Sequence, residues 1–171
     1  FATTPINSGG AYAVSVLTQP SNPTQTCSVT NGSGTITANV TNVTINCTTS
    51  SFTVGGTVSG LTGSGLVLRN NGGNNLAVPA DGSFSFTTPV ASGQTYAVTV
   101  LTQPTSPAQT CTIANASGMI GGANVTNVVV NCSDTTYTIG GTVSGLSGTG
   151  LVLHNNGGNN LAISANGSFT F

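Results

Sequence analysis

The ionisable side chains of this sequence are few and widely separated. Asp81 and Asp134 are the only carboxylates, Arg69 is the only basic residue, and His154 is the only imidazole. Hydrolytic acid–base chemistry needs two paired carboxylates, or a nucleophile with a base and a residue that orients the base. A triad through His154 would need Asp and Ser partners from distant segments. We therefore expect no catalytic residue and no enzymatic activity.

The four cysteines form two candidate pairs, Cys27 with Cys47 and Cys111 with Cys132. Metal binding and free thiols are the alternatives. Thiolate metal sites favour short Cys-x-x-Cys clusters with His, and calcium favours clustered carboxylates. The sequence has neither pattern, so it predicts two disulfides, no metal and no cofactor. Each disulfide should stabilise its domain by roughly 3 kcal/mol and places the chain outside a reducing cytoplasm.

The composition favours a folded β protein. Charged residues make up 2% of the chain and hydrophobic residues 37%, with a formal net charge of −1. Abundant Val, Ile and Thr favour strands, whereas disordered chains have few β-branched residues and a high net charge. The sequence has no basic patch, which excludes nucleic acid as a partner. It also has no apolar run long enough for a membrane span.

An internal repeat of about 85 residues organises the chain. Residues 52–60 recur as 137–145, and residues 17–20 recur as 101–104. Cys27 and Cys111 occupy the same place in successive repeats. The turn sequence Asn-Asn-Gly-Gly-Asn-Asn is present twice, before Leu76 and before Leu161.

The phase of the repeat predicts three parts. Residues 1–50 are the second half of one repeat, 51–135 a complete repeat and 136–171 the first half of the next. Phe1 aligns with Phe86 and Phe171, inside a predicted strand. We expect either a window cut from a longer array, which is the simpler explanation, or completion of the half-repeats by a neighbouring chain. No signal peptide or initiator Met is visible, so we expect mature or excerpted material.

Seven strands are predicted within the complete repeat, separated by Gly, Asn, Pro and Ser. They are 52–58, 65–70, 75–79, 83–88, 95–103, 109–115 and 124–132. Asn-Gly-Gly-Asn between Leu68 and Leu76 predicts a tight hairpin, and no window has a helical period. The pattern predicts an all-β fold of tandem immunoglobulin-like β-sandwich repeats with one disulfide each. A β-solenoid is the alternative.

Several motifs resemble tandem repeats of secreted and cell-surface bacterial proteins whose role is largely unknown. They are Gly-Gly-Thr-Val-Ser-Gly-Leu at 55–61, Gly-Leu-Val-Leu at 65–68, Gly-Ser-Phe at 82–84, Tyr-Ala-Val at 96–98, Gln-Thr-Cys at 109–111 and Asn-Val-Thr-Asn-Val at 124–128. The resemblance covers essentially the whole chain. It implies an extracellular, immunoglobulin-like array and carries over no catalytic residue.

Eight Asn-x-Ser/Thr sequons are candidate glycosylation sites. They lie at Asn31, Asn39, Asn42, Asn46, Asn115, Asn124, Asn131 and Asn166. The alternative is that a chain rich in Asn and Thr contains sequons by chance, with Asn serving turns. For a bacterial protein the alternative is favoured.

The shortage of charge bears on function through the sheet edges. Soluble β proteins guard edge strands with Lys, Glu and inward-pointing charges, and this chain has almost none. We therefore expect self-association: a structural extracellular fibre, stalk or filament whose partners are copies of itself or neighbouring repeats. The alternative is an adhesin or glycan-binding array with a surface glycan or protein as partner. In such a binder, residues at loop tips should differ between repeats. Arg69 and His154 are one such pair of equivalent positions, and Pro79 and Ser164 are another.

Overall fold

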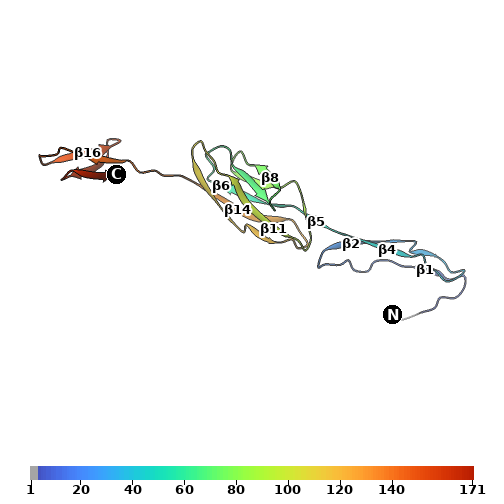
Figure 1. The fold of residues 1–171 in the computed structure, drawn as a ribbon. Helices are drawn as coiled ribbons and strands as arrows, with labels where there is room; N and C mark the ends of the chain where they lie inside the picture. The colour runs from blue at the N-terminus through green and yellow to red at the C-terminus, as the bar shows by residue number, and fades with distance from the viewer. Residues whose placement is uncertain (1–3) are drawn as a thin grey trace. The chain divides into compact units, whose positions relative to one another are not determined.

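The computed structural model describes residues 4–171 and divides the chain into two compact units, Phe1–Asp134 and Thr135–Phe171 (Figure 1). Phe1, which the sequence aligns with Phe86, lies outside the described residues. All regular elements within 4–171 are strands, which confirms the all-β prediction. No helix in this range could cross a membrane.

The complete repeat of unit 1 contains two four-stranded sheets. The first has the strand order β13 (Ser117–Met119), β11 (Thr95–Thr102), β7 (Val67–Asn70) and β8 (Asn74–Ala77), with all pairs antiparallel. A tight turn joins β7 to β8. Asn71 in that turn has φ 48°, so the predicted hairpin is confirmed.

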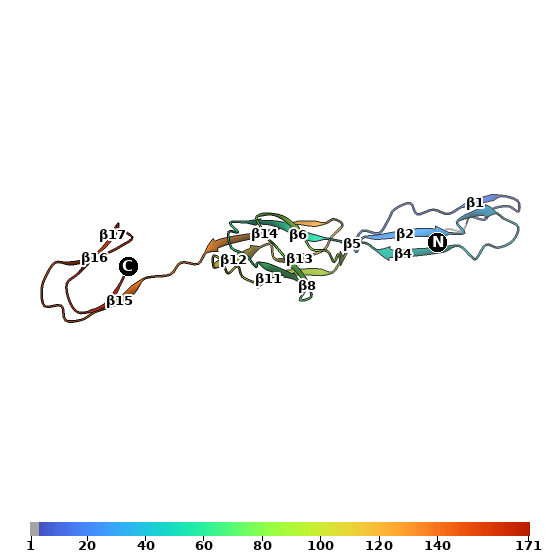
Figure 2. The ribbon, with the colours of Figure 1, turned by 90° about the horizontal axis from the view of Figure 1, so that it is seen from above.

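The second sheet has the order β12 (Gln109–Ala114), β14 (Val125–Asp134), β6 (Val54–Ser59) and β9 (Gly82–Ser85). β6 pairs in parallel with β14, while the two outer pairs are antiparallel. The first long strand of the repeat therefore lies beside its last. Figure 2 shows β6 and β14 side by side.

One hydrophobic core lies between these two sheets. Leu68 and Val98 come from the first sheet, Val54 and Val130 from the second, and each is at most 3% exposed. Phe86, after β9, is 1% exposed and is the largest fully buried side chain. Within 4–50 and 135–171, no described residue is fully buried. The core is thus confined to the complete repeat.

The N-terminal part of unit 1 contains two strand pairs. β1 (Ala11–Ala13) pairs with β3 (Ser33–Thr35), and β2 (Gln25–Thr30) pairs with β4 (Thr44–Thr49). After Ser50 the chain enters β5 directly. β5 (Ser51–Phe52) pairs with β10 (Val90–Ala91) at the start of the complete repeat.

Unit 2 contains two antiparallel hairpin-like pairs. β15 (Gly140–Val143) pairs with β18 (Gly167–Thr170), and β16 (Leu151–Asn155) pairs with β17 (Asn159–Ile163). These four strands are the sequence counterparts of β6, β9, β7 and β8. Phe169 packs edge to face on Phe171, as Phe84 does on Phe86.

All seven predicted segments of the complete repeat contain strands, with two differences. The first segment is divided at Thr53 into β5 and β6, because Thr53 N–H donates to the side-chain oxygen of Asn124. The short strands β10 and β13 were not predicted, because their two or three residues carry no periodic pattern. The division into 1–50, 51–135 and 136–171 stays a prediction.

Gly56 of β6 lies opposite Val128 of β14, and this predicts the effect of adding one methyl group. A Cβ at Gly56 would overlap the carbonyl oxygen of Val128. Gly56→Ala should separate the parallel pair and destabilise unit 1 by about 2–4 kcal/mol. Urea unfolding, followed through NMR signals of β6 and β14 amides, measures this loss.

The matched control is Gly141→Ala at the equivalent position of unit 2. There a Cβ would meet only the ring of Phe169, which can rotate away. If Gly56→Ala unfolds at the same urea concentration as the unmodified chain, the close approach of these strands is wrong.

Candidate functional site

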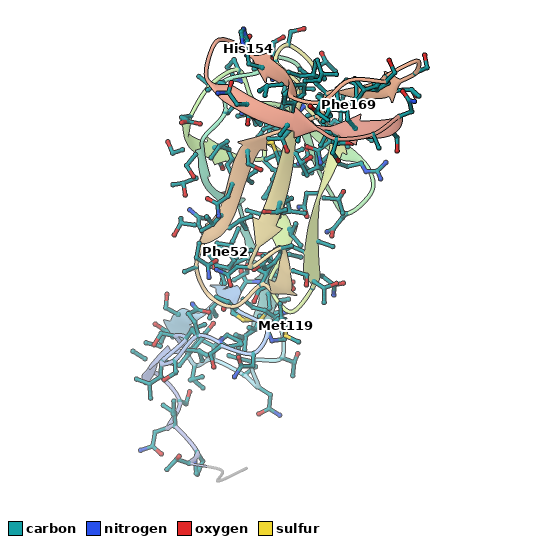
Figure 3. All side chains as sticks on the ribbon, turned by 90° about the vertical axis from the view of Figure 1, so that its left-hand side faces the viewer. Phe52, Met119, His154 and Phe169 are labelled. Carbon is teal, nitrogen blue, oxygen red and sulfur yellow. A yellow bond between two sulfur atoms is a disulfide. The ribbon has the colours of Figure 1, made fainter. Side chains whose placement is uncertain are left out.

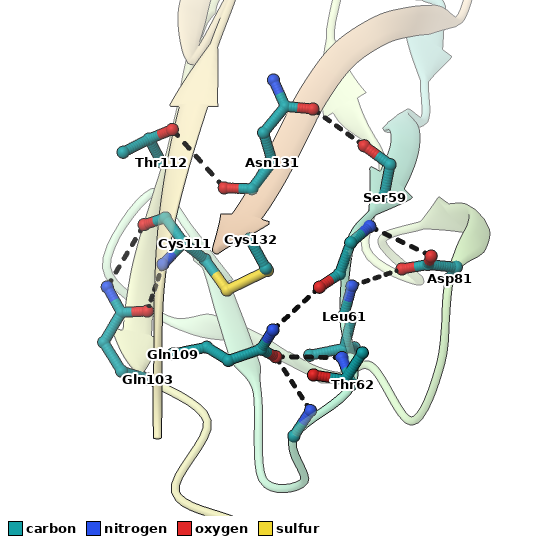
Figure 4. Close-up of a disulfide and its surroundings, with 12 residues drawn as sticks. Ser59, Leu61, Thr62, Asp81, Gln103, Gln109, Cys111, Thr112, Asn131 and Cys132 are labelled. Atoms are coloured by element: carbon teal, nitrogen blue, oxygen red, sulfur yellow. Dashed lines mark hydrogen bonds between the residues drawn. A yellow bond between two sulfur atoms is a disulfide. The ribbon is translucent and has the colours of Figure 1, made fainter. Parts of the chain in front are cut away.

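Asp81 binds backbone and does not face a second carboxylate. Its carboxylate accepts hydrogen bonds from Gly60 N–H at 3.0 Å and Leu61 N–H at 2.7 Å (Figure 4). Its counterpart Asn166 accepts from Leu146 N–H at 2.6 Å and donates to the Leu146 carbonyl at 3.2 Å. Because a neutral amide fills the same role, the charge of Asp81 is not required. The Asp81 side chain ties the loop after β6 to the segment before β9.

Asp134 lies in a strand and not in a linker between repeats. It is the last residue of β14, paired with Gln109. Its Oδ1 accepts hydrogen bonds from Gln109 Nε2 at 2.9 Å and from the Thr62 hydroxyl at 3.3 Å. Both carboxylates of the chain thus hold loops against strands.

Gln109 is a buried amide, 3% exposed, with every hydrogen-bonding position in use. Its Nε2 donates to the Gly60 carbonyl at 2.8 Å as well as to Asp134. Its Oε1 accepts from Thr62 N–H at 2.9 Å and Gly63 N–H at 2.8 Å (Figure 4). The side chain therefore ties the loop after β6 to the ends of β12 and β14. The sequence places this residue in the recurring Gln-Thr-Cys motif but does not predict its hydrogen bonds.

Arg69 is not at a loop tip or in a solvated position, which corrects the expectation. It lies inside β7, opposite Thr99 on one side and Asn75 on the other, and is half-buried. Its Nε is buried with no hydrogen-bond partner among the described residues. Its counterpart His154 lies in β16 opposite Asn160 and is exposed (Figure 3). Strand positions of this kind do not form a variable loop surface.

The structure contains two disulfides, Cys27–Cys47 and Cys111–Cys132, the pairs expected from the sequence. Each joins directly opposed residues of neighbouring antiparallel strands, β2 with β4 and β12 with β14. The bond therefore does not connect the two sheets. It attaches the outermost strand of a sheet to the next strand. Disulfides of this kind indicate an oxidising environment outside the reducing cytoplasm.

The outer edge of β12 is covered by an uncharged side chain. Gln103 accepts a hydrogen bond from Cys111 N–H at 2.8 Å and donates to the Cys111 carbonyl at 3.2 Å. Gln19 binds Cys27 in the same way, at 2.7 and 3.1 Å. The amide thus takes the place of a neighbouring strand. Charged guards are almost absent, as the sequence indicates, and at this edge a neutral amide does the guarding instead.

The edges at β8 and β9 are different. Each is the last strand of its sheet, and a groove of about 370 Å³ runs between them, lined by Leu76, Val78 and Phe84 among others. An equivalent groove of about 340 Å³ lies between β17 and β18 of unit 2, lined by Leu161 and Phe169 among others. In the part of the chain that the structure describes, no side-chain amide bridges the outer edge of either β8 or β9 as Gln103 does for β12. These two edges are the candidate assembly surface.

All eight sequon asparagines are exposed, and five of them have hydrogen-bonding roles in the fold. Asn31 and Asn115 donate to the carbonyls of Asn42 and Asn127. Asn124, Asn131 and Asn166 accept from Thr53, Ser59 and Leu146. Asn39, Asn42 and Asn46 have no such side-chain bond among the described residues. Glycosylation itself stays a prediction.

No group of three or more His, Cys, Asp or Glu side chains that could hold a metal ion occurs among residues 4–171. No model of a known protein family, no curated protein and no solved structure matches the chain.

The four-bond environment of Gln109 predicts a large effect of removing its amide. Gln109→Leu keeps the volume but leaves Thr62 N–H, Gly63 N–H and the Gly60 carbonyl without partners. We expect a loss of about 2–4 kcal/mol in the unfolding free energy of unit 1, measured by urea denaturation. Gln25→Leu is the matched control, because Gln25 makes only one side-chain bond, to Thr49 at 3.2 Å. If Gln109→Leu and Gln25→Leu lower the unfolding free energy by the same amount, the structural role given to the Gln109 amide is wrong.

The edge role of Gln103 predicts a change in association. Gln103→Leu removes both bonds to Cys111, so the Cys111 amide should exchange with solvent about tenfold faster and light scattering should show larger species. Gln94→Leu serves as control, since the exposed Gln94 side chain makes no hydrogen bond to an edge strand among the described residues. If the Cys111 amide exchanges at the same rate in Gln103→Leu as in the unmodified protein, Gln103 does not protect the edge of β12.

Proposed function

We propose that the chain is a structural component of an extracellular or cell-surface protein, built from tandem immunoglobulin-like β-sandwich repeats that form a fibre, stalk or self-assembling filament. One observation carries the proposal. Both carboxylates have structural contacts: Asp81 accepts hydrogen bonds from loop backbone, and Asp134 accepts them from the side chains of Gln109 and Thr62. Gln103 and Gln109 bind the backbone of an edge strand and of a loop. Such a molecule is organised for mechanical integrity and not for turnover.

The immunoglobulin-like part of the proposal is supported by the sheet topology. Two sheets enclose one core, and neighbouring strands in the first are antiparallel. The disulfide departs from immunoglobulin domains, where it joins the two sheets. Here Cys111–Cys132 lies within one sheet, so it reinforces an edge instead of the core.

The assembly part of the proposal is supported by the β8–β9 edge. Unpaired backbone N–H and C=O groups of an edge strand can accept a strand from another chain. The groove beside them offers Leu76 and Phe84, both only half-buried. Because the same groove recurs in unit 2 with Leu161 and Phe169, a second copy would find an equivalent surface in each unit.

A glycan-binding array is the second candidate function, and one groove favours it. A hollow of unit 1, about 750 Å³, is lined by Asn70, Asn71, Asn74 and Gln94 among others. Amides donate and accept hydrogen bonds from sugar hydroxyls. No aromatic residue lines this groove, so it lacks the ring on which sugars commonly stack. Structural assembly is therefore the better supported proposal.

Negative-stain electron microscopy of the purified, oxidised protein tests the assembly proposal. We expect filaments longer than one chain. Ala77→Lys places a charge on β8 and should shorten or abolish them, because edge charges oppose strand addition. Ala97→Lys adds the same charge to β11, an inner strand, and should leave filaments intact.

Two results would contradict the proposal. Isolated particles of the unmodified protein at every concentration would exclude self-assembly and leave a stalk or a binding array. Filaments of normal length in Ala77→Lys would exclude the β8 edge as the joining surface.

A further inference from the structure

The two repeats of unit 1 contact one another through a four-residue loop, Ser21–Thr24, which we call the docking loop. Ser21 and Thr24 form a bridge that closes it. Thr24 N–H donates to the hydroxyl oxygen of Ser92 at 2.9 Å, and that hydroxyl donates in turn to the Gly121 carbonyl at 2.8 Å. The Ser92 side chain therefore connects one repeat to two segments of the next.

The segment between the repeats takes part in the same network. Ser50 is the single residue between β4 and β5. Its N–H donates to the Thr24 carbonyl and its carbonyl accepts from Ser92 N–H, both at 2.9 Å. Thr24 and Ser92 are thus joined directly and also through Ser50. A segment held at both its N–H and its C=O cannot act as a free hinge.

The surface that receives the docking loop is shaped by small residues, and we call Ser92, Gly93, Gly121 and Gly122 the socket. Ser92 is 4% exposed. A Cβ at Gly93 would lie 3.3 Å from Pro23 Cβ, and a Cβ at Gly122 would lie 3.1 Å from Thr24 Oγ1. Larger side chains at these glycines would push the loop away.

A second copy of the socket backbone exists without a loop on it. In the complete repeat Gly93 N–H donates to the Ile120 carbonyl at 2.8 Å, and Gly93 has φ 84°. In the first repeat Gly9 N–H donates to the Ile36 carbonyl at 2.8 Å, and Gly9 also has φ 84°. Nothing described lies within 4 Å of a Cβ at Gly9. The socket is therefore formed before a loop occupies it, which lowers the entropy lost on docking.

A second docking loop is also formed in advance. Thr105 and Ala108 close the loop around Pro107 with the same bridge that Ser21 and Thr24 make around Pro23. The sockets are not identical, since Thr37 in the first repeat stands where the complete repeat has Gly121 and Gly122. Ser8 and Gly9 of the first repeat match Ser92 and Gly93 of the complete repeat.

We propose that each repeat carries, at its N-terminal pole, a socket for the docking loop of the preceding repeat, and that this contact holds neighbouring repeats in one fixed orientation. The occupant of the Ser92 socket is the loop Ser21–Thr24. The loop around Pro107 fits the socket of a following repeat, and the socket at Ser8–Gly9 fits the loop of a preceding one. This inference concerns the joint between repeats and does not depend on self-assembly.

Residual dipolar couplings of backbone amides in the full chain test the fixed orientation. Amides of β2 and β4 are compared with those of β6, β11 and β14. We expect one alignment tensor to fit both sets in the unmodified protein. Ser92→Ala should require two tensors, and the Thr24 amide should exchange about tenfold faster because its acceptor is gone.

Gly122→Leu provides a second, steric variant and should also require two tensors. Ser8→Ala is the control for Ser92→Ala, because the equivalent hydroxyl receives no described loop. Gly73→Leu is the control for Gly122→Leu, because a Cβ at Gly73 meets nothing within 4 Å. Both controls should keep one tensor.

Two tensors in the unmodified protein, or one tensor in both Ser92→Ala and Gly122→Leu, would overturn the inference. Because these couplings are measured on unassembled protein below the concentration at which filaments form, failure here leaves the filament proposal untouched. Conversely, a loss of filaments without a change in the couplings would not contradict the proposed contact between repeats.

Discussion

The amide of Gln109 makes the contact on which the end of the complete repeat depends. Its four hydrogen bonds bring the loop after β6, the start of β12 and the end of β14 to one point. A buried amide destabilises a fold unless its donors and acceptor are all satisfied. In Gln109 both donors and the acceptor are satisfied. Any other arrangement of the three segments would leave buried polar groups unpaired, so this amide fixes the point at which the segments meet. The parallel pairing of β6 with β14 ends beside this contact.

The same physical solution recurs at other places where backbone groups would be left unpaired. With 2% charged residues, the chain has few Lys, Arg, Asp or Glu side chains for capping loops or guarding edges. Neutral amides do this work at Gln103 and Asn166. The disulfide at Cys111 lies on the strand that Gln103 covers, so a covalent bond and an amide protect the same edge. The edges at β8 and β9 have no equivalent amide cover among the described residues, and for this reason they are the edges that we propose for assembly.

The joint between repeats has consequences for the mechanical behaviour of an array. A flexible linker would let modules move as separate bodies, as expected for small interfaces. Ser50 instead has both backbone groups bonded, and Ser92 bonds the docking loop directly. Glycine at the socket allows this approach because a side chain would occupy the space of Pro23 or Thr24. The joint that we propose would keep neighbouring repeats in one orientation, which is what the proposed stalk or fibre requires.

The sequence by itself determined the features that depend on neighbouring residues. The strand predicted at 95–103 is β11, and its side chains alternate, with Tyr96 and Val98 buried. The turn at Asn71 and the two cysteine pairs could also be predicted, because turn conformation is local and each pair recurs in the repeat. The strands β10 and β13 could not, since they are too short to show a period.

Tertiary structure alone decided which polar residues matter. Gln103 lies 8 residues from Cys111, and Gln109 lies 46 or more residues from the loop amides it binds. Both glutamines lie in motifs that recur in the repeat, but their hydrogen bonds could not be predicted, because they form only when separate strands are brought into register. The placement of each disulfide within one sheet, and of Ser92 against the preceding repeat, was decided in the same way. Contacts between distant segments have no local signature, since their free energy is gained only after the chain has folded.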